Sequence, residues 1–228
     1  MNTNPIVQLT DPSLLESMQR ESIDLESLAG WSRGIDRNAL PKSEEQAWLY
    51  GTPEWDALSF EAKREQLWIE SAQIASDFIW LKEGLSQLFE RMNARFGARV
   101  PEEIREAMDA FREKQLVYAE MFRRWLALAG LPLTPRPEFM DFVATIERNH
   151  PIGGLLCTYA MERSLSVAAL RMNGTDVLTA EVFAANHEQE VRHLAFARSL
   201  CENAIRTATM NETKVRIGYL LRGYMKVV

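Results

Sequence analysis

Apolar residues recur every three or four positions over most of this sequence, and this spacing restricts its fold more than any other feature. In the segment 59–95 they are Leu67, Ile74, Phe78, Leu81, Leu85, Leu88 and Met92. Because an α-helix has about 3.6 residues per turn, the spacing places all of them on one face of a single long helix. No stretch of any length has the strict alternation of a half-buried strand. The sequence therefore predicts an all-α fold.

The same spacing predicts further helices along the chain. A second long helix follows Pro101 and stops at Gly130, and a shorter one covers 138–149 before a break at 151–154. A third long helix covers about 155–172, and a fourth covers about 176–207. Four long helices in two hairpins, with short helices around them, predict a helical bundle. The second helix carries one buried stripe of Ile104, Met108, Phe111, Gln115, Tyr118, Phe122 and Trp125.

The first 55 residues lack a sustained helical pattern and contain several turn signals. We expect them to form an irregular arm with a short helix at 12–20, placed against a bundle at 59–207. A final amphipathic helix is expected at 213–228, and the whole chain, 1–228, is expected to be a single helical domain. We further expect four apolar side chains of the arm to pack across the first helical hairpin, namely Trp48, Leu49, Tyr50 and Trp55.

Composition and charge narrow the class of protein. The net charge of −6 disfavours nucleic-acid binding, which requires a basic surface against phosphates. No apolar run approaches the ~20 residues that cross a membrane, and the first residues lack the features of a secretion signal. Cys157 and Cys201 lie in apolar helical stretches and are expected to be buried thiols. We therefore expect a soluble cytoplasmic protein that binds neither nucleic acid nor membrane.

Ionisable residues lie on the inner stripes of the third and fourth helices. The fourth helix has Glu190 and His193 on its stripe, and the third has Glu162. Residues three apart on a helix lie about 60° apart around the axis, so Glu190 and His193 can reach one point. Buried carboxylates beside an imidazole are usually held together by a divalent metal ion. The alternative is an exposed Glu190 paired with a basic residue, and a His193 whose hydrogen bonds are satisfied in the core.

The residues EVRHLAFAR, at 190–198, resemble the last metal-binding helix of the p-aminobenzoate N-oxygenase family, which are ferritin-like di-iron oxygenases. The segments 48–65, 75–89 and 119–130 agree with this family, so that the resemblance covers most of 45–205. It implies a ferritin-like four-helix bundle in which two irons use O₂ to oxidise an arylamine nitrogen. It also implies metal ligands, and these fall on Glu162, Glu190 and His193.

Other positions depart from that family's pattern. Asn186 stands where the family has an additional His, and His187 follows it. In the first half, Gln115 stands where the family has Glu, and Tyr118 stands where it has His. The remaining Glu falls on Lys82 or Glu83, and helical phase favours Lys82 for the inner stripe. An inward Lys82 would provide the positive charge that a metal otherwise provides, so we expect at most one metal ion per chain.

The candidate site residues are expected to act as metal ligands, as catalytic residues or as the lining of the site. Glu162, Glu190 and His193 are the expected metal ligands, with Glu83 and His187 as further candidates; Tyr118 and Lys82 are the candidate catalytic residues; Gln115 and Asn186 are expected to line the site.

The resemblance implies a non-haem oxygenase that uses O₂ and one or two iron ions, or manganese, on a small amine or aromatic substrate, with a homodimer as a compatible assembly. Two alternatives stay open. One is a catalytically silent relative that binds a ligand or protein partner, with its acids paired to Lys82. The other is a haem-oxygenase-like di-iron oxidase, which shares the pattern F-x-x-x-H-E followed by VRH at 183–193.

Overall fold

The computed structural model describes residues 24–28, 30–96, 102–149 and 151–207, and this part of the chain is helical, with no strand. Five longer helices are α4 (Phe60–Phe96), α5 (Glu102–Ala129), α6 (Glu138–Asn149), α7 (Pro151–Ala169) and α8 (Val177–Thr207). Short elements precede them: η1 (Leu25–Ser27), α2 (Gly30–Arg33), η2 (Glu44–Gln46) and α3 (Pro53–Asp56). The all-α class predicted from the sequence is confirmed.

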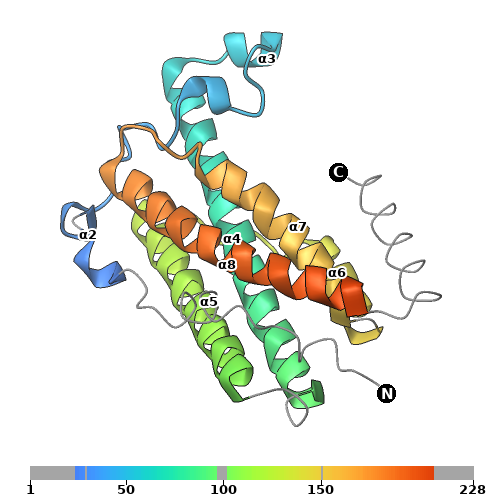
Figure 1. The fold of residues 1–228 in the computed structure, drawn as a ribbon. Coiled ribbons are helices and arrows are strands. Elements are labelled where there is room, and N and C mark those ends of the chain that lie inside the picture. Colours follow the sequence, from blue (N-terminus) through green and yellow to red (C-terminus); the bar gives the residue numbers. More distant parts are fainter. Residues whose placement is uncertain (1–23, 29, 97–101, 150, 208–228) are drawn as a thin grey trace.

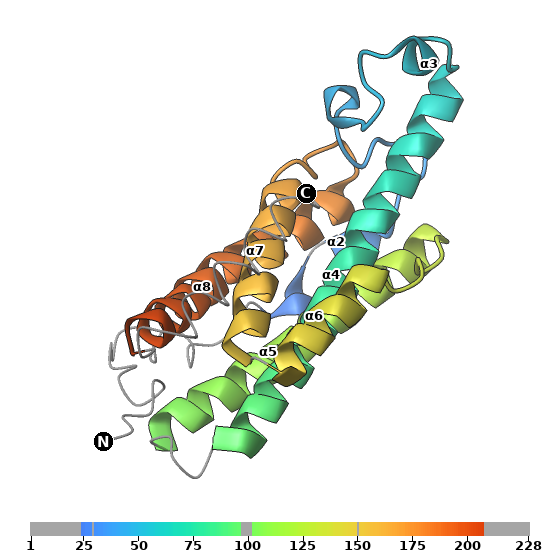
Figure 2. The ribbon, with the colours of Figure 1, turned by 90° about the vertical axis from the view of Figure 1, so that its right-hand side faces the viewer.

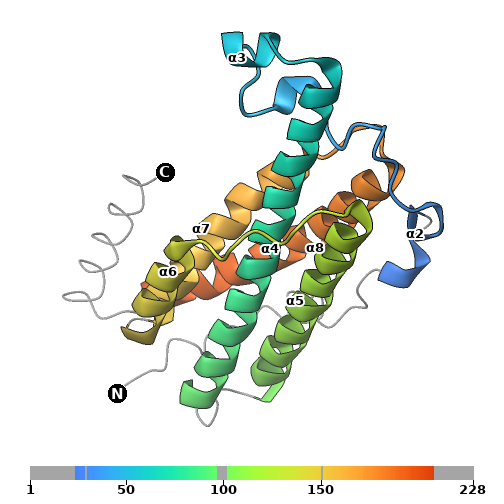
Figure 3. The ribbon, with the colours of Figure 1, turned by 180° about the vertical axis from the view of Figure 1, so that it is seen from behind.

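The four longest helices pack side by side. Helix α4 contacts α5 and α7, while α8 contacts α7 and α5 (Figure 1). Helix α6 lies along α7 and α4, as the view turned by 90° shows (Figure 2). The first turns of α4, together with α3, project beyond the other long helices, which is clearest from behind (Figure 3). The inner faces of α4, α5, α7 and α8 therefore meet over only part of α4.

The helix bounds follow the local signals in the sequence closely, with one exception. Helix α5 ends where Gly130 adopts a positive φ of 64°, and the N–H of Leu131 donates to the carbonyl of Leu126 at 3.0 Å. Helix α8 begins after Asp176, whose carboxylate accepts from the N–H of Thr179 at 2.8 Å. Helix α7, however, begins at Pro151 and not near residue 155. A proline suits the first position of a helix, because its missing N–H would have no partner there.

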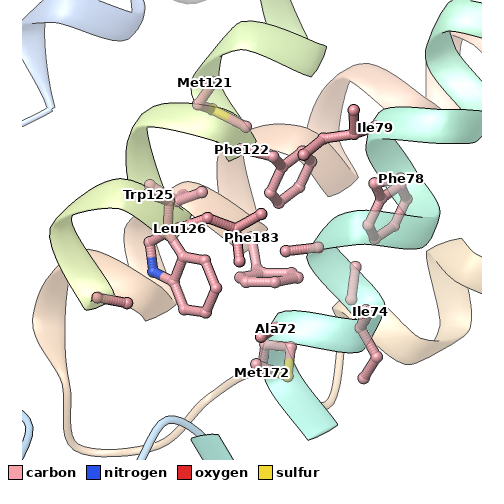
Figure 4. Close-up of a cluster of buried hydrophobic side chains, with 14 of the residues drawn as sticks. Ala72, Ile74, Phe78, Ile79, Met121, Phe122, Trp125, Leu126, Met172 and Phe183 are labelled. Carbon is pink, nitrogen blue, oxygen red and sulfur yellow. The ribbon is translucent and has the colours of Figure 1, made fainter. Parts of the chain in front are cut away.

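The buried residues of α4 and α5 confirm the inner faces that the sequence predicted for these two helices. The apolar residues expected to face inward from α4 are buried, as are Met108, Phe111, Tyr118, Phe122 and Trp125 of α5. Figure 4 shows the centre of this core, where aromatic rings from three helices meet. The Phe78 and Phe122 rings stack at 5.0 Å, and the edge of Phe183 from α8 meets Phe122 at 5.1 Å. These rings form an aromatic layer between α4, α5 and α8.

The segment before α4 is bound to the connection between α7 and α8. The N–H of Thr175 donates to the Leu40 carbonyl at 2.8 Å, and the N–H of Gly174 donates to Pro41 at 3.2 Å. A side-chain carbon at Gly174 would lie 2.0 Å from the Leu40 carbonyl oxygen, so only glycine fits this approach. Further along, the N–H of Gly30 donates to the carboxylate of Glu181 on α8 at 2.7 Å. These contacts fix the start of α8 and, through it, the face that α8 presents to the core.

The expectation for the four apolar residues of the arm is wrong in three cases. Trp55 is buried against Leu67 of α4, but Trp48, Leu49 and Tyr50 are 61%, 42% and 50% exposed. The reason is a backbone contact, since the N–H of Trp48 donates to the buried carboxylate of Glu70 at 3.2 Å. In this turn the N–H of Trp48 points towards α4, while the side chains of Trp48, Leu49 and Tyr50 lie largely exposed.

Two sequence predictions, the short helix at 12–20 and the final helix at 213–228, lie outside the described residues. Among the described helices, none combines the length and the apolar composition that a membrane crossing requires.

Candidate metal centre

Two acidic residues and a histidine meet in the interior between α7 and α8. They are Glu162 from α7 and Glu190 and His193 from α8, and we call them the Glu/Glu/His cluster. All three are buried, with at most 1% of their surface exposed. One ligand atom from each lies within 4.8 Å of the others, and His193 Nδ1 lies 3.8 Å from Glu162 Oε1. The cluster could hold a metal ion.

The local sequence explains this convergence. Glu190 and His193 lie about 60° apart on α8, on the same face as the buried Phe183 and Asn186. Glu162 lies on the buried stripe of α7 together with Ser166 and Ala169. Because the two helices are antiparallel and in contact, the two stripes face each other.

Lys82 of α4 reaches the same cluster from the opposite side. Its ammonium donates to Glu190 Oε1 at 2.6 Å and to Gln115 Oε1 of α5 at 3.4 Å. Lys82 and Gln115 are fully buried. Tyr118 lies beside them, with the centre of its ring 5.4 Å from Lys82 Nζ. Lys82 and Gln115 thus lie at the cluster, where the sequence predicted an inward lysine and a lining amide.

The two further ligand candidates lie elsewhere, and both expectations are corrected. Glu83 forms an ion pair with Arg123 on a partly exposed face, because it is rotated about 100° around α4 from Lys82. His187 is half-buried, and its Nδ1 lies 3.1 Å from Ser166 Oγ. Within the described part of the chain, neither side chain belongs to the Glu/Glu/His cluster, whose possible ligand atoms lie together.

The hydrogen bonds of His193 indicate which of its ring nitrogens accepts and which donates. Gln115 faces Lys82 through its oxygen, so its Nε2 donates to His193 Nδ1, 2.7 Å away. A neutral imidazole that accepts at Nδ1 carries its proton at Nε2. Gln189 Nε2 lies 2.8 Å from that nitrogen, and a half-turn of its amide would present the oxygen as the acceptor. A metal ion that uses His193 Nδ1 must therefore displace Gln115.

The charges of the site balance without a metal ion. Burial raises the pKa of Glu162 well above its ordinary value, and the nearby Glu190 charge raises this pKa further, while Lys82 acts in the opposite direction. A protonated Glu162 beside a Lys82–Glu190 ion pair leaves no net charge among these three groups. A divalent ion would have to displace the proton of Glu162 and weaken the contact of Lys82.

Several polar atoms of the site lack hydrogen-bond partners within the described part of the chain. They are Oε2 of Glu190 and both amide atoms of Asn186, whereas a protonated Glu162 can donate to Glu190. Buried polar atoms are almost always bonded, so these atoms require a further partner, which a water molecule or an ion can provide. The carboxylate oxygens fit a divalent cation, since they are hard anionic ligands that converge with an imidazole.

Sequence reasoning missed Gln189. It lies four residues before His193, and residues at this spacing on a helix are neighbours. That spacing was the available signal for a residue that orients the imidazole. It also missed the buried ion pair of Lys42 with Glu70, 2.6 Å long, which lies apart from the cluster and ties the arm to α4.

Comparison of the chain with models of protein families, with curated proteins and with solved structures finds no match.

Proposed function

We propose that this protein is a ferritin-like, non-haem metal-dependent oxygenase that holds one divalent ion, iron or manganese, at Glu162, Glu190 and His193. It would use O₂ to oxidise a small amine or aromatic substrate. The observation that carries the proposal is the buried Glu/Glu/His cluster, with its ligand atoms within 4.8 Å of one another. The sequence resemblance at 190–198 supports the reaction class.

The donor set fits one metal ion better than two. Two carboxylates and an imidazole from neighbouring helices are half of a di-iron carboxylate site. The other half would require acidic and histidine residues on α4 and α5, where this chain has Lys82, Gln115 and Tyr118. An ammonium cannot act as a ligand while it is protonated, and the amide of Gln115 is a weaker, neutral oxygen ligand. The site is therefore proposed to be mononuclear.

The chain's own residues would prepare the site for this chemistry. Gln189 would orient the imidazole through Nε2, as outer groups commonly do for metal-binding histidines, while Gln115 would give up Nδ1 to the ion. Glu162 would release its proton when the ion binds. Because the two carboxylates alone balance a divalent ion, Lys82 would then carry an excess positive charge and compete with the ion for Glu190. Bound iron would provide the one-electron chemistry with O₂ that these side chains lack.

A second candidate function is favoured by the contact between Lys82 and Glu190. At 2.6 Å and fully buried, this ion pair provides a positive charge in the place where a metal would otherwise be needed. In this case the protein would be a catalytically silent relative of ferritin-like oxygenases, and it would bind a ligand or protein partner instead of a metal. Metal content separates the two candidates directly.

The decisive experiment is metal analysis of full-length protein purified from cells supplied with iron and manganese. We expect about one metal ion per chain in the wild type and a large loss in His193→Ala, because a neutral nitrogen ligand disappears from a small set. His187→Ala is the matched control, since that histidine bonds Ser166 outside the cluster, and it should retain its metal.

Three results would reject the proposal: a metal-free wild type, two ions per chain, or unchanged metal in His193→Ala. The reaction class is tested separately by oxygen uptake of the iron-loaded protein with small aromatic amines. We expect uptake in the wild type and none in His193→Ala. A metal-loaded wild type without uptake for any amine would leave a metal-binding protein that is not an oxygenase of this class.

A further inference from the structure

Asn186 is a fully buried amide beside the Glu/Glu/His cluster. It lies on α8 one turn before Glu190, on the face that also carries His193, and none of its surface is exposed. Within the described part of the chain neither its amide nitrogen nor its oxygen has a hydrogen-bond partner. Burial of such an amide without partners is costly, so its position requires an explanation.

A metal ion at the cluster explains the carboxylate oxygens but not Asn186. The Asn186 amide nitrogen has two N–H groups, and it remains a donor whichever way the amide is turned. A cation cannot accept a hydrogen bond. The partner of this nitrogen must therefore be an atom with a lone pair, which the metal alone does not supply.

The surroundings of Asn186 show where that partner lies. On the side away from Glu190, Phe183 lies one turn before Asn186 on the same face and packs against Phe122 and Phe78 in the aromatic layer (Figure 4). On the other side lie Glu190 and its ion pair with Lys82. Phe183, Glu190 and Lys82 are all buried, so a partner of Asn186 lies in the interior of the bundle.

We propose that Asn186 donates to the acceptor atom of a small exogenous ligand that binds next to the metal ion, and thereby orients that ligand at the cluster. The ligand is a small molecule, or the end of one, with an oxygen or nitrogen acceptor. This inference rests on the proposed metal centre and adds to it the residue that recognises the molecule bound beside the ion. Asn186 acts on that ligand and not as a metal ligand.

The first test needs neither metal nor ligand. In the metal-free protein Asn186→Leu replaces an unpaired amide with an apolar side chain of the same branching. We expect the Tm to rise by about 3 °C. The matched control is Asn93→Leu, in which the lost amide donates to Asp109 at 3.0 Å, so its Tm should fall. A fall of the Tm in Asn186→Leu would show that this amide is already bonded within the protein and would overturn the proposal.

The second test measures ligand binding at the loaded site. Cobalt(II) replaces the native ion, and azide serves as a small acceptor whose binding shifts the visible cobalt bands. We expect Asn186→Leu and Asn186→Ala to bind Co²⁺ within about threefold of the wild type but to bind azide at least tenfold more weakly, which corresponds to the loss of one hydrogen bond of about 1.4 kcal/mol. The alanine variant covers the case in which leucine does not fit.

The two proposals fail in different ways. If the wild type does not bind Co²⁺, the metal centre is wrong, whatever the Tm of Asn186→Leu. If Co²⁺ binds and azide affinity is the same in all three proteins, the metal centre stands and the role of Asn186 is wrong. Weaker Co²⁺ binding in both variants, by tenfold or more, would make Asn186 a metal ligand and would also overturn the inference.

Discussion

Replacing Lys82 with methionine should strengthen metal binding at the Glu/Glu/His cluster. Lys82 Nζ lies 2.6 Å from Glu190 Oε1, so the ammonium occupies a carboxylate oxygen that a metal ion would use. Methionine keeps the length and the apolar stem of lysine but has no charge and no N–H group. In Lys82→Met the carboxylate of Glu190 therefore has no competing cation.

The structure gives the size of this competition. Two unit charges 2.6 Å apart attract each other by about 6 kcal/mol at an effective dielectric constant of about 20. The cost of burying both charges offsets part of this attraction. If half of it remains, about 3 kcal/mol is released for metal binding, and every 1.4 kcal/mol is a factor of about ten in affinity. We expect Lys82→Met to bind Mn²⁺ at least ~100-fold more tightly than the wild type.

The assay is competition for Mn²⁺ with a chromophoric chelator of known affinity, together with thermal unfolding with and without Mn²⁺. Lys42→Met is a matched control, because Lys42 is equally buried and lies 2.6 Å from Glu70, away from the cluster. Both metal-free variants should lose about 3–5 kcal/mol of stability, since each leaves a buried carboxylate alone. Added Mn²⁺ should restore the stability of Lys82→Met only. Equal Mn²⁺ affinity in Lys82→Met and the wild type would refute the competition between lysine and metal.

Two further predictions concern stability. Because the pKa of Glu162 is raised in the folded state by burial and by Glu190, its proton stabilises the metal-free fold at low pH, and this stability is lost as the pH rises through the raised pKa. Glu162→Gln should abolish that decline in the free energy of unfolding measured with urea, whereas parallel pH profiles for the two proteins would contradict the assignment. Phe183→Ala should lose about 3–5 kcal/mol in the same assay, because this buried ring packs against Phe122 and Trp125. Val191→Ala, at a position 55% exposed on the same helix, should change the stability by less than about 0.5 kcal/mol, and equal losses in both variants would exclude an aromatic layer that stabilises the fold.

The helices and their buried faces could be predicted from the sequence because they depend on local repetition. A period of three to four residues identifies a helix, and the apolar members of that period identify its inner face. The same argument placed Glu162, Glu190 and His193 on inner stripes, and it preferred Lys82 to Glu83 at the neighbouring position. Those assignments require only the geometry of a single helix. The start of α7 at Pro151 was missed, because the glycines at 153–154 weaken a helix signal without preventing the helix.

The contacts between helices were decided only by the tertiary structure. The sequence offered Lys82 as a partner of the acids as one alternative. Residue spacing gives a phase around one axis but no relative height for two helices, so only packing fixed the contact of Lys82 with Glu190, 108 residues away in the chain. The outward turn at Trp48 has the same origin, since it depends on the buried Glu70 in another element. The unpartnered amide of Asn186 is likewise a property of its surroundings. Its presence on the stripe was predictable, but the lack of a partner is defined by every atom around it, and those atoms come from separate parts of the chain.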